Sequence, residues 1–358
     1  TFERGPFRVS PIRVTHSTAD SLALAIETPE HLLLHTGDFR IDEDPVDGEA
    51  MELDRFAELG TRGVDLLLSD STNVEIPGSC GSEQSVSSTI EAAARETKGR
   101  VFVAAFSSNT PRMQLLFDLA ERLGRRVVLA GRSVLTHSRI AAGLGYLRHR
   151  SSVVVPLERA SDLAPEETFV IMSGTQGEPF SALGRLSAGK LRGLVVEPGD
   201  LVVISGRFIP GNELAIYRTV SDLARRGARV LHSRKEAGVH VSGHAHRDEQ
   251  QKMLELVRPR AFVPVHGAYH HLAGHADLAR ELGVREVRVV ENGVPVELTT
   301  EGELREGETV ETGRVHVDGV AGVSDAILRD RRNLRAGVAL AVLVLDRGRG
   351  ELAAPPEV

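Results

Sequence analysis

The sequence predicts an α/β protein, and three observations lead to this fold class. Aromatic residues make up only 4% of the chain and Trp is absent, so the core must consist of the small aliphatic residues that fill buried parallel sheets. From about Gln84, helical and strand patterns alternate regularly, which predicts right-handed crossovers and a parallel sheet. With 358 residues, the chain is long enough for two domains with separate cores.

The part of the chain before Gln84 is expected to consist mainly of strands. Short apolar runs alternate there with turn residues, which is typical of strands. The last run ends in Ser69 and Asp70, and a buried strand of this kind delivers a polar side chain at its carboxyl end. The expected elements are the strands Phe7–Thr15, Leu22–Thr28, His31–His35 and Val64–Leu68, and the helix Glu52–Leu59.

The middle of the chain is expected to form a separate layer of parallel strands. Thr110 and Pro111 are suited to the cap and first turn of a helix. The expected helices are Gln84–Glu96, Pro111–Leu123 and Glu213–Arg226, and the expected strands are Val101–Phe106, Arg126–Ala130, Thr168–Met172, Leu201–Ser205 and Arg229–His232.

The stretch from Gly238 to His271 is rich in histidine. Imidazoles are common metal ligands and proton carriers near neutral pH, so this stretch predicts a functional site. The expected elements from here onward are the helices Asp248–Val257 and His271–Leu282 and the strands Ala261–Val265, Glu286–Val290 and Val338–Leu345. The histidines of the stretch are His240, His244, His246, His266, His270 and His271.

The formal charge of −7 argues against a protein that coats nucleic acid by bulk attraction. Basic clusters do occur, and we interpret them as solvated helix ends rather than phosphate tracks. These clusters are Arg122, Arg125, Arg126 and Arg132, then Arg225 to Lys235, and Arg329 to Arg335.

A single cysteine, Cys80, cannot form an internal disulfide, so a reducing compartment and a cytoplasmic location are expected. The apolar runs are too short to cross a membrane, and no membrane contact is expected.

Two further candidates directly follow predicted strands. His16 stands in VTHSTAD and Asp38 in HTGDFR. An aspartate that follows glycine at a strand end can approach a metal closely, and Asp can bridge two zinc ions. Alone, each residue is more often a turn residue than a ligand.

In their order along the chain, these motifs resemble those of the ribonuclease J family. The resemblance runs from Arg8 to about Asp346 and is carried by VTHSTADS, HTGDFRID with PVDG, LLLSDSTN, FSSN, SGTQGEP, IPGNE, HVSGHA and FVPVHGAYHHL. It implies a partial metallo-β-lactamase αββα sandwich with an inserted β-CASP domain, a parallel sheet flanked by helices. The implied domains are residues 1–83 and 233–305 for the two parts of the lactamase-like domain, 84–232 for the insertion, and 306–358 for a linker with closing strands.

The resemblance also implies roles for single residues. His16 would bind one zinc ion, Asp38 would bridge two, and His266 would bind the second. Asp70 and His244 would be catalytic, with Asp70 orienting a nearby histidine or a metal-bound water, and His244 either giving a proton to the leaving group or stabilising the phosphate. The implied phosphate-binding run is His240, Val241, Ser242, Gly243 and His244.

The implied function is zinc-dependent hydrolysis of RNA phosphodiesters, with water as the nucleophile. The family acts as a 5′-3′ exonuclease on 5′-monophosphorylated RNA and as an endonuclease, in RNA maturation and decay. The implied partners are single-stranded RNA, further copies of the chain in a homodimer or homotetramer, and proteins of an RNA-degradation complex.

One departure from the family pattern is large, because the His-x-His-x-Asp-His motif that supplies most metal ligands does not occur. The nearest match begins at His244 and ends in Glu249. His246 and Asp248 within it are therefore interpreted as surface residues at a helix start. His270 and His271 are interpreted as residues at the edge of the site or in a helix cap. We therefore expect that the motif precedes Thr1 in the gene, that a C-terminal domain follows Val358, and that this chain alone binds zinc partially and is inactive.

Two alternatives remain open. The first is a metal-depleted homologue that binds RNA as a partner subunit without catalysis. The second, a hydrolase of a lactone or thioester, is disfavoured by the helix–strand block from about Gln84 to Arg229, which a small-molecule hydrolase does not need.

Overall fold

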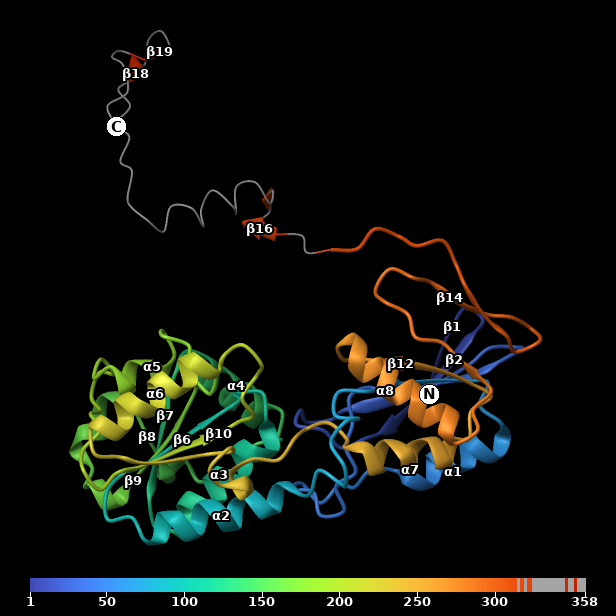
Figure 1. The fold of residues 1–358 in the computed structure, drawn as a ribbon. Helices are drawn as coiled ribbons and strands as arrows, with labels where there is room; N and C mark the ends of the chain where they lie inside the picture. The colour runs from blue at the N-terminus through green and yellow to red at the C-terminus, as the bar shows by residue number, and fades with distance from the viewer. Residues whose placement is uncertain (314–315, 319–320, 324–344, 347–350, 353–358) are drawn as a thin grey trace. The chain divides into compact units, whose positions relative to one another are not determined.

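The computed structural model describes residues 1–313, 316–318, 321–323, 345–346 and 351–352 (Figure 1). Residues 1–291 and 296–306 form one compact unit, and the second unit comprises residues 292–295 and those from 307 onward. Most of the strand predicted at Val338–Leu345 lies outside the described residues, and the predicted domain boundaries stay predictions. In the second unit, β16 (His316–Asp318) pairs with β17 (Ala321–Val323) and β18 (Leu345–Asp346) with β19 (Glu351–Leu352).

The first sheet of the large unit has seven strands in the order β1-β2-β3-β4-β5-β12-β13. Strands β1 to β4 are antiparallel neighbours, whereas β4, β5, β12 and β13 are parallel. The parallel half therefore brings several carboxyl ends to one edge. The strands are β1 (Phe2–Arg4), β2 (Phe7–Arg13), β3 (Leu22–Glu27), β4 (Leu32–His35), β5 (Leu66–Asp70), β12 (Ala261–Val265) and β13 (Glu286–Val287).

The two faces of this sheet are covered differently. Because side chains alternate along a strand, Leu67 and Phe262 point to one face and Leu66 and Val263 to the other. The first face packs against three helices, α1 (Leu53–Arg62), α7 (Arg247–Val257) and α8 (Tyr269–Glu281). The second face meets the hairpin of β14 (Val296–Leu298) and β15 (Leu304–Glu306). The described residues thus supply one helix layer and one complete sheet of the expected sandwich.

The second sheet has six strands in the order β11-β10-β6-β9-β7-β8, and every pair is parallel. This agrees with the parallel sheet predicted from the alternation of helices and strands. The strands are β6 (Val101–Ala105), β7 (Arg126–Ala130), β8 (Val154–Val155), β9 (Thr168–Met172), β10 (Leu201–Ser205) and β11 (Arg229–His232).

Helices cover both faces of the six-stranded sheet (Figure 1). Val101 and Val103 of β6 pack toward α2, α3 and α4, whereas Phe102 and Ala104 pack toward α5 and α6. All four side chains are fully buried, which explains the continuous apolar runs of this region. The helices are α2 (Glu83–Arg95), α3 (Thr110–Arg122), α4 (Arg132–Gly143), α5 (Ala182–Ser187) and α6 (Glu213–Arg225), and short 3₁₀ turns span Ser151–Val153, Leu157–Asp162, Pro165–Glu167 and Ala237–Val239.

Local details differ from the sequence prediction. Helices α4 and α5 were not predicted. The cap of α3 is Asn109, whose side chain accepts a hydrogen bond from the Arg112 amide, and the predicted cap Thr110 lies inside the first turn. Strand β5 extends to Asp70 rather than ending at Leu68. Within the described ranges, none of the helices combines the length and the apolar character needed to cross a membrane.

Candidate metal centre

The candidate site lies at the carboxyl edge of the seven-stranded sheet. Strand β5 ends in Asp70, β12 is followed directly by His266, and the loop after β4 carries Asp38. Since these strands are parallel neighbours, the three side chains reach the same edge. The structure therefore brings together residues that are far apart in the sequence.

Asp70 is the buried centre of the cluster, with a relative exposure of 1%. His244 Nδ1 donates a hydrogen bond of 2.7 Å to Oδ2, and Oδ1 lies 3.2 Å from His266 Nδ1. The amide and hydroxyl of Thr72 both donate to Oδ1. Burial alone would raise the pKa of Asp70, but these hydrogen bonds outweigh it and hold the pKa well below its usual range. Asp70 is thus a fixed carboxylate that orients two imidazoles.

His266 has a left-handed backbone conformation, with φ of 55°, which is rare for a residue other than glycine. Its Nδ1 atom lies 2.9 Å from Thr72 Oγ1 and 3.5 Å from Asp38 Oδ1. The hydrogen bond with Asp70 raises the pKa of His266. The strained turn thus directs the Nδ1 atom toward both carboxylates.

His16 approaches the cluster from the loop after β2. Its Nδ1–H donates a 2.7 Å hydrogen bond to the carbonyl of Gly243, which leaves the Nε2 lone pair 3.9 Å from Asp38 Oδ2. A Cβ atom at Gly243 would lie only 2.9 Å from His16 Cε1, so this close approach requires glycine. Burial lowers the pKa of His16, which favours the neutral imidazole that binds metals.

These side chains fit a divalent metal. Asp38, Asp70, His244 and His266 each offer a ligand atom, and these atoms all lie within 4.8 Å of one another. Zinc binds imidazole nitrogen and carboxylate oxygen at about 2.0 to 2.2 Å, so the ligand atoms of one ion lie within about 4.4 Å of one another, and small side-chain movements would bring this group to that spacing. His16 adds a further nitrogen beside Asp38. The donor types and their spacing therefore agree with a metal centre.

The predicted phosphate-binding run forms hydrogen bonds with side chains from several parts of the chain. Ser242 Oγ accepts hydrogen bonds from Asn73 Nδ2 and from the His244 amide, which fixes the turn. The Ser242 carbonyl accepts a bond from Arg40 Nη1. Asn73 Oδ1 in turn accepts a bond from Arg207, which follows β10 of the six-stranded sheet. The Arg207 guanidinium is therefore linked to the run through the side chain of Asn73.

Two members of the run point away from solvent. Val241 packs against the core formed by α2, α3 and the six-stranded sheet, so only its backbone is free to contact a substrate. Burial, followed by the nearby Arg112, lowers the pKa of His240 to about 3. No described residue is a hydrogen-bond partner of His240 Nδ1. Burial therefore favours the neutral imidazole of His240, and its place in the phosphate-binding run stays a prediction.

A buried ion network supports the loops on which the site is built. Arg40 is 2% exposed and its Nη2 donates a 2.6 Å hydrogen bond to Asp42. Glu83 at the start of α2 pairs with Arg112 of α3 and lies 3.6 Å from Arg40. Because Arg40 also holds the Ser242 carbonyl, the network links the two sheets to the phosphate-binding run.

The remaining histidines of the stretch from Gly238 to His271 lie at the starts of helices α7 and α8. His246 is the N-cap of α7, and Asp248 is an exposed residue of its first turn. His271 Nδ1 accepts a hydrogen bond from the Ala268 amide at the start of α8. His270 is exposed and lies 3.9 Å from Glu75. These positions agree with the interpretation of the four residues as helix-start or peripheral groups.

Sequence reasoning missed Thr72, Asn73 and Arg207 as members of the site. All three stand inside or beside quoted motifs, LLLSDSTN and IPGNE, but hydroxyl, amide and guanidinium groups after strands are common in turns. Their roles depend on contacts with residues far along the chain, such as the contact of Thr72 with His266.

Two family descriptions match parts of the chain. "Ribonuclease J, beta-CASP domain" matches residues 98–223, which include most of the six-stranded sheet. "Zn-dependent metallo-hydrolase RNA specificity domain" matches residues 233–290, which include His244 and His266.

Curated relatives cover nearly the whole chain. A ribonuclease J of Mycobacterium tuberculosis (strain CDC 1551 / Oshkosh) is 43% identical over 356 residues, which are 98% of this chain and 63% of the relative. A ribonuclease J of Synechocystis sp. is 38% identical over 354 residues, 98% of this chain and 55% of the relative. One of Helicobacter pylori (strain 26695) is 35% identical, with 97% and 51% covered. The chain thus spans between 51% and 63% of the length of these relatives.

A solved structure shares the fold. A protein of unknown function from Enterococcus faecalis V583 superposes with a TM-score of 0.55 at 18% identity, over 81% of this chain and 64% of that chain. At this level of identity the similarity concerns the fold alone.

Proposed function

Because the chain belongs to the ribonuclease J family, we propose that its protein is a zinc-dependent ribonuclease that hydrolyses RNA phosphodiesters. We further propose 5′-3′ exonuclease activity on 5′-monophosphorylated RNA together with endonuclease activity. The observation that carries the proposal is the buried Asp70 carboxylate, which holds His244 and His266 beside Asp38. A group of this kind suits metal-assisted hydrolysis.

In this proposal, Asp38, His16 and His266 hold the metals, which are two zinc ions in the intact protein. Bound zinc supplies Lewis-acid stabilisation of charge on the phosphoryl oxygens. Thr72 keeps its hydroxyl between Asp70 and His266 and so fixes the direction of the His266 ring. A partner of this kind typically changes metal affinity or activity by about tenfold to a hundredfold.

His244 is proposed to protonate the leaving oxygen. Its Nδ1–H is committed to Asp70, so Nε2 is the atom that can carry a proton to the substrate. The Asp70 carboxylate stabilises the imidazolium form, as a buried carboxylate does for the general acid of other hydrolases. Proton transfer of this kind contributes on the order of a hundredfold or more to the rate.

RNA as the substrate is supported by the rim formed by the loop after β9 and by α6, since Gln176 of this loop donates a hydrogen bond to the Arg207 carbonyl. Phe180, in the loop after β9, is 91% exposed, and Tyr217 of α6 is 40% exposed. Gly177 of the same loop lies directly against the backbone of α6, so the loop and the helix are neighbours. Exposed aromatic rings beside cationic groups are typical of surfaces that bind single-stranded RNA. We propose that a strand passes along this rim to the metals.

The partners are proposed on the family alone. They are single-stranded RNA, further copies of the chain in a homodimer or homotetramer, and proteins of an RNA-degradation complex. The binding subunit without catalysis is kept only as an outcome of the test, because no described contact favours it.

The test uses His266→Ala in the intact protein. We expect loss of cleavage of 5′-monophosphorylated RNA in the presence of zinc, with an unchanged melting temperature, because His266 is half exposed and contributes little to the core. The matched control is His137→Ala, a change at an exposed histidine of α4. Normal cleavage by His266→Ala contradicts its role as a metal ligand, and an inactive wild-type protein that still binds RNA identifies the binding subunit instead.

A further inference from the structure

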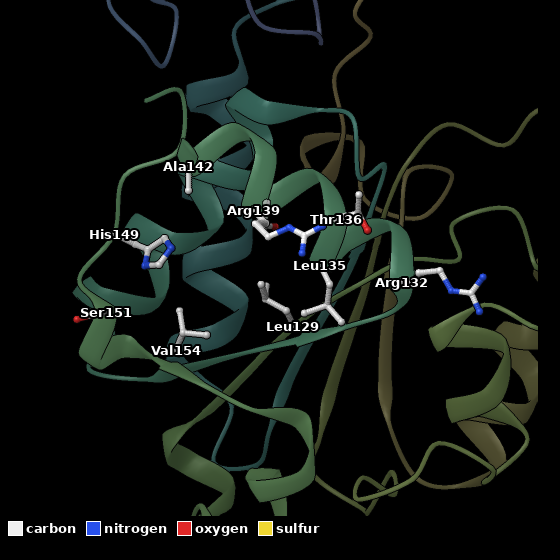
Figure 2. Close-up of a pocket in the computed structure, with 10 residues that line it drawn as sticks. Leu129, Arg132, Leu135, Thr136, Arg139, Ala142, His149, Ser151 and Val154 are labelled. Atoms are coloured by element: carbon white, nitrogen blue, oxygen red, sulfur yellow. The ribbon is translucent and has the colours of Figure 1, made fainter. Parts of the chain in front are cut away.

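A pocket that is separate from the candidate metal centre lies beside the six-stranded sheet, along one side of α4. Its volume is about 630 Å³, which is in the usual range of ligand pockets. Arg132, Leu135, Thr136 and Arg139 follow the helical spacing of i, i+3, i+4 and i+7 and so form one stripe of α4 that faces the pocket. Leu129 of β7 and Val154 of β8 contribute from the sheet edge (Figure 2).

The pocket is cationic. Arg132 and Arg139 line it, and neither makes an ion pair with a described residue. No Asp or Glu occurs between Arg122 and Leu157, although the whole chain has a net charge of −7. Two unpaired guanidinium groups without a nearby carboxylate favour an anionic ligand.

The pocket also offers an aromatic surface and an unused polar group. The imidazole of His149 stacks on the buried ring of Phe117, with a centroid distance of 4.6 Å and an interplanar angle of 12°. This contact fixes one face of an exposed ring and leaves the other face free. Ser138 lines the pocket at 6% exposure, and its hydroxyl has no hydrogen-bond partner among the described residues. A buried hydroxyl without a partner is costly unless a ligand or water satisfies it.

We propose that this pocket binds a nucleotide. The base stacks on His149 above the aliphatic surface of Leu129 and Leu135, and the phosphate pairs with Arg139, which lies between the two ends of the pocket (Figure 2). None of the residues of the candidate metal centre lines this pocket. The site is therefore separate from the proposed cleavage chemistry.

The first experiment measures binding of 5′-AMP by calorimetry to the intact protein in EDTA, so that cleavage is excluded. Adenosine and ribose 5-phosphate serve as partial ligands, and both are expected to bind more weakly than AMP because each lacks one half of the contacts. Arg139→Glu is expected to weaken AMP binding by about tenfold or more, since a charge-assisted hydrogen bond is replaced by repulsion. His149→Ala should weaken AMP but leave ribose 5-phosphate unchanged.

The matched control is Arg192→Glu, the same charge change at an exposed arginine elsewhere in the six-stranded sheet domain. It should leave AMP binding unchanged, which separates the pocket from general charge and from AMP bound at the metal centre. Arg139 is exposed, so folding of the variant is not at risk. Equal AMP affinity in the Arg139→Glu and Arg192→Glu proteins overturns the proposal. So does a self-association of the wild type that Arg139→Glu abolishes, because a second copy of the chain then covers the pocket.

A nucleotide can come from two sources, a free mononucleotide or one residue of an RNA chain, and the RNA source rests on the proposed function. A labelled oligoadenylate without a 5′-phosphate distinguishes them. Weaker oligoadenylate binding by Arg139→Glu, together with competition by AMP, identifies RNA. Weaker binding of AMP by Arg139→Glu, with unchanged binding of the oligoadenylate, identifies a free nucleotide. Cleavage is measured separately with zinc, so absent cleavage with intact AMP binding counts against the ribonuclease and not against this pocket.

Discussion

The parallel strands of the two sheets use charged groups in opposite ways at their carboxyl ends. On the six-stranded sheet, Arg112 and Glu83 are 1% and 0% exposed and bond to each other and to Ser205 and Asn109. On the seven-stranded sheet, the side chains of Asp38 and His266 are 41% and 50% exposed and face one another across an open site. Parallel strands thus support a closed network in one sheet and an open cluster in the other.

The difference concerns what is left for a ligand. The closed network pairs its charges inside the protein and fixes the loops, although Arg40 Nε and Arg112 Nη2 have no hydrogen-bond partner among the described residues. Asp38 and His266 instead keep exposed atoms that a ligand can reach. Polar residues at a sheet edge therefore indicate function when their unused hydrogen-bonding atoms are also accessible from solvent.

The largest expected effect concerns the open cluster. Asp70→Asn keeps the shape of the side chain but removes the charge that orients His244 and His266. We expect the rate of RNA cleavage to fall by about a thousandfold, or about 4 kcal/mol in the barrier. Steady-state kinetics of the intact protein with zinc measures this. The control is Asp277→Asn, a change at an exposed carboxylate of α8, and similar rates for the two variants would remove Asp70 from the catalytic group.

The next effect concerns the closed network. Glu83→Gln leaves Arg112 without its buried anionic partner and removes one of the two carboxylates beside Arg40, which keeps Asp42. We expect the free energy of unfolding to fall by about 3 kcal/mol, because an uncompensated buried charge is costly. Urea denaturation of Glu83→Gln and of Glu91→Gln makes the comparison. Glu91 pairs with Arg95 near the surface, where an ion pair contributes at most about 1 kcal/mol. Equal losses would show that the network is not a structural support.

A third effect depends on pH. His275 lies behind the open cluster, bonded through Nδ1 to Ser71, and burial lowers its pKa to about 3. Below the unfolded-state pKa of about 6.5, only the unfolded chain takes up this proton, so stability decreases as the pH falls from there toward 3. Between pH 7 and pH 5, His275 should account for a decrease of about 2 kcal/mol in the free energy of unfolding.

The measurement is urea denaturation of wild type and His275→Gln at both pH values. The variant should lose much of the pH dependence and keep the part due to His240, whose pKa burial also lowers to about 3. The exposed His137→Gln should behave as wild type. An unchanged slope in His275→Gln would mean that this imidazole is not held neutral.

The smallest effect concerns the rim of the six-stranded sheet. Phe180→Ala removes an exposed ring, so stability should change little, within about 0.5 kcal/mol. The dissociation constant for single-stranded RNA should rise by about fivefold to tenfold, as expected for the loss of one stacked base. Fluorescence anisotropy with labelled RNA in EDTA measures it. Leu144→Ala, at another exposed apolar side chain, is the control, and equal binding by both variants would remove the rim from the RNA path.

Much of the six-stranded sheet was predictable from the sequence. Strands β7, β9, β10 and β11 have the predicted bounds, because a strand buried on both faces is a continuous apolar run that ends at turn residues. Helix α4 was missed, and its exposed Leu135 and Ile140 explain why. Apolar residues on the solvent side blur the amphipathic pattern that marks a surface helix.

The candidate site was predictable only in part. The resemblance of the motifs to the ribonuclease J family pointed to His16, Asp38, Asp70, His244 and His266, and the structure brings all of them together. Which groups support them could not be read from the sequence, because the Thr72–His266 contact joins residues far apart in the chain. The phosphate-binding run was predicted as a whole and stays a prediction, and the structure packs Val241 against the core while Ser242 and the His244 amide form the turn beside Asn73.

The left-handed backbone at His266 has a consequence for selection. A side chain other than glycine in this conformation costs about 1 to 2 kcal/mol, and His266 offsets this cost through its contacts with Asp70 and Thr72. Among variants that lack the imidazole, His266→Gly should therefore be more stable than His266→Ala. A library at this position that is sorted only for thermal stability would rank glycine above other side chains that cannot bond to Asp70, whereas sorting for RNA turnover would retain histidine alone.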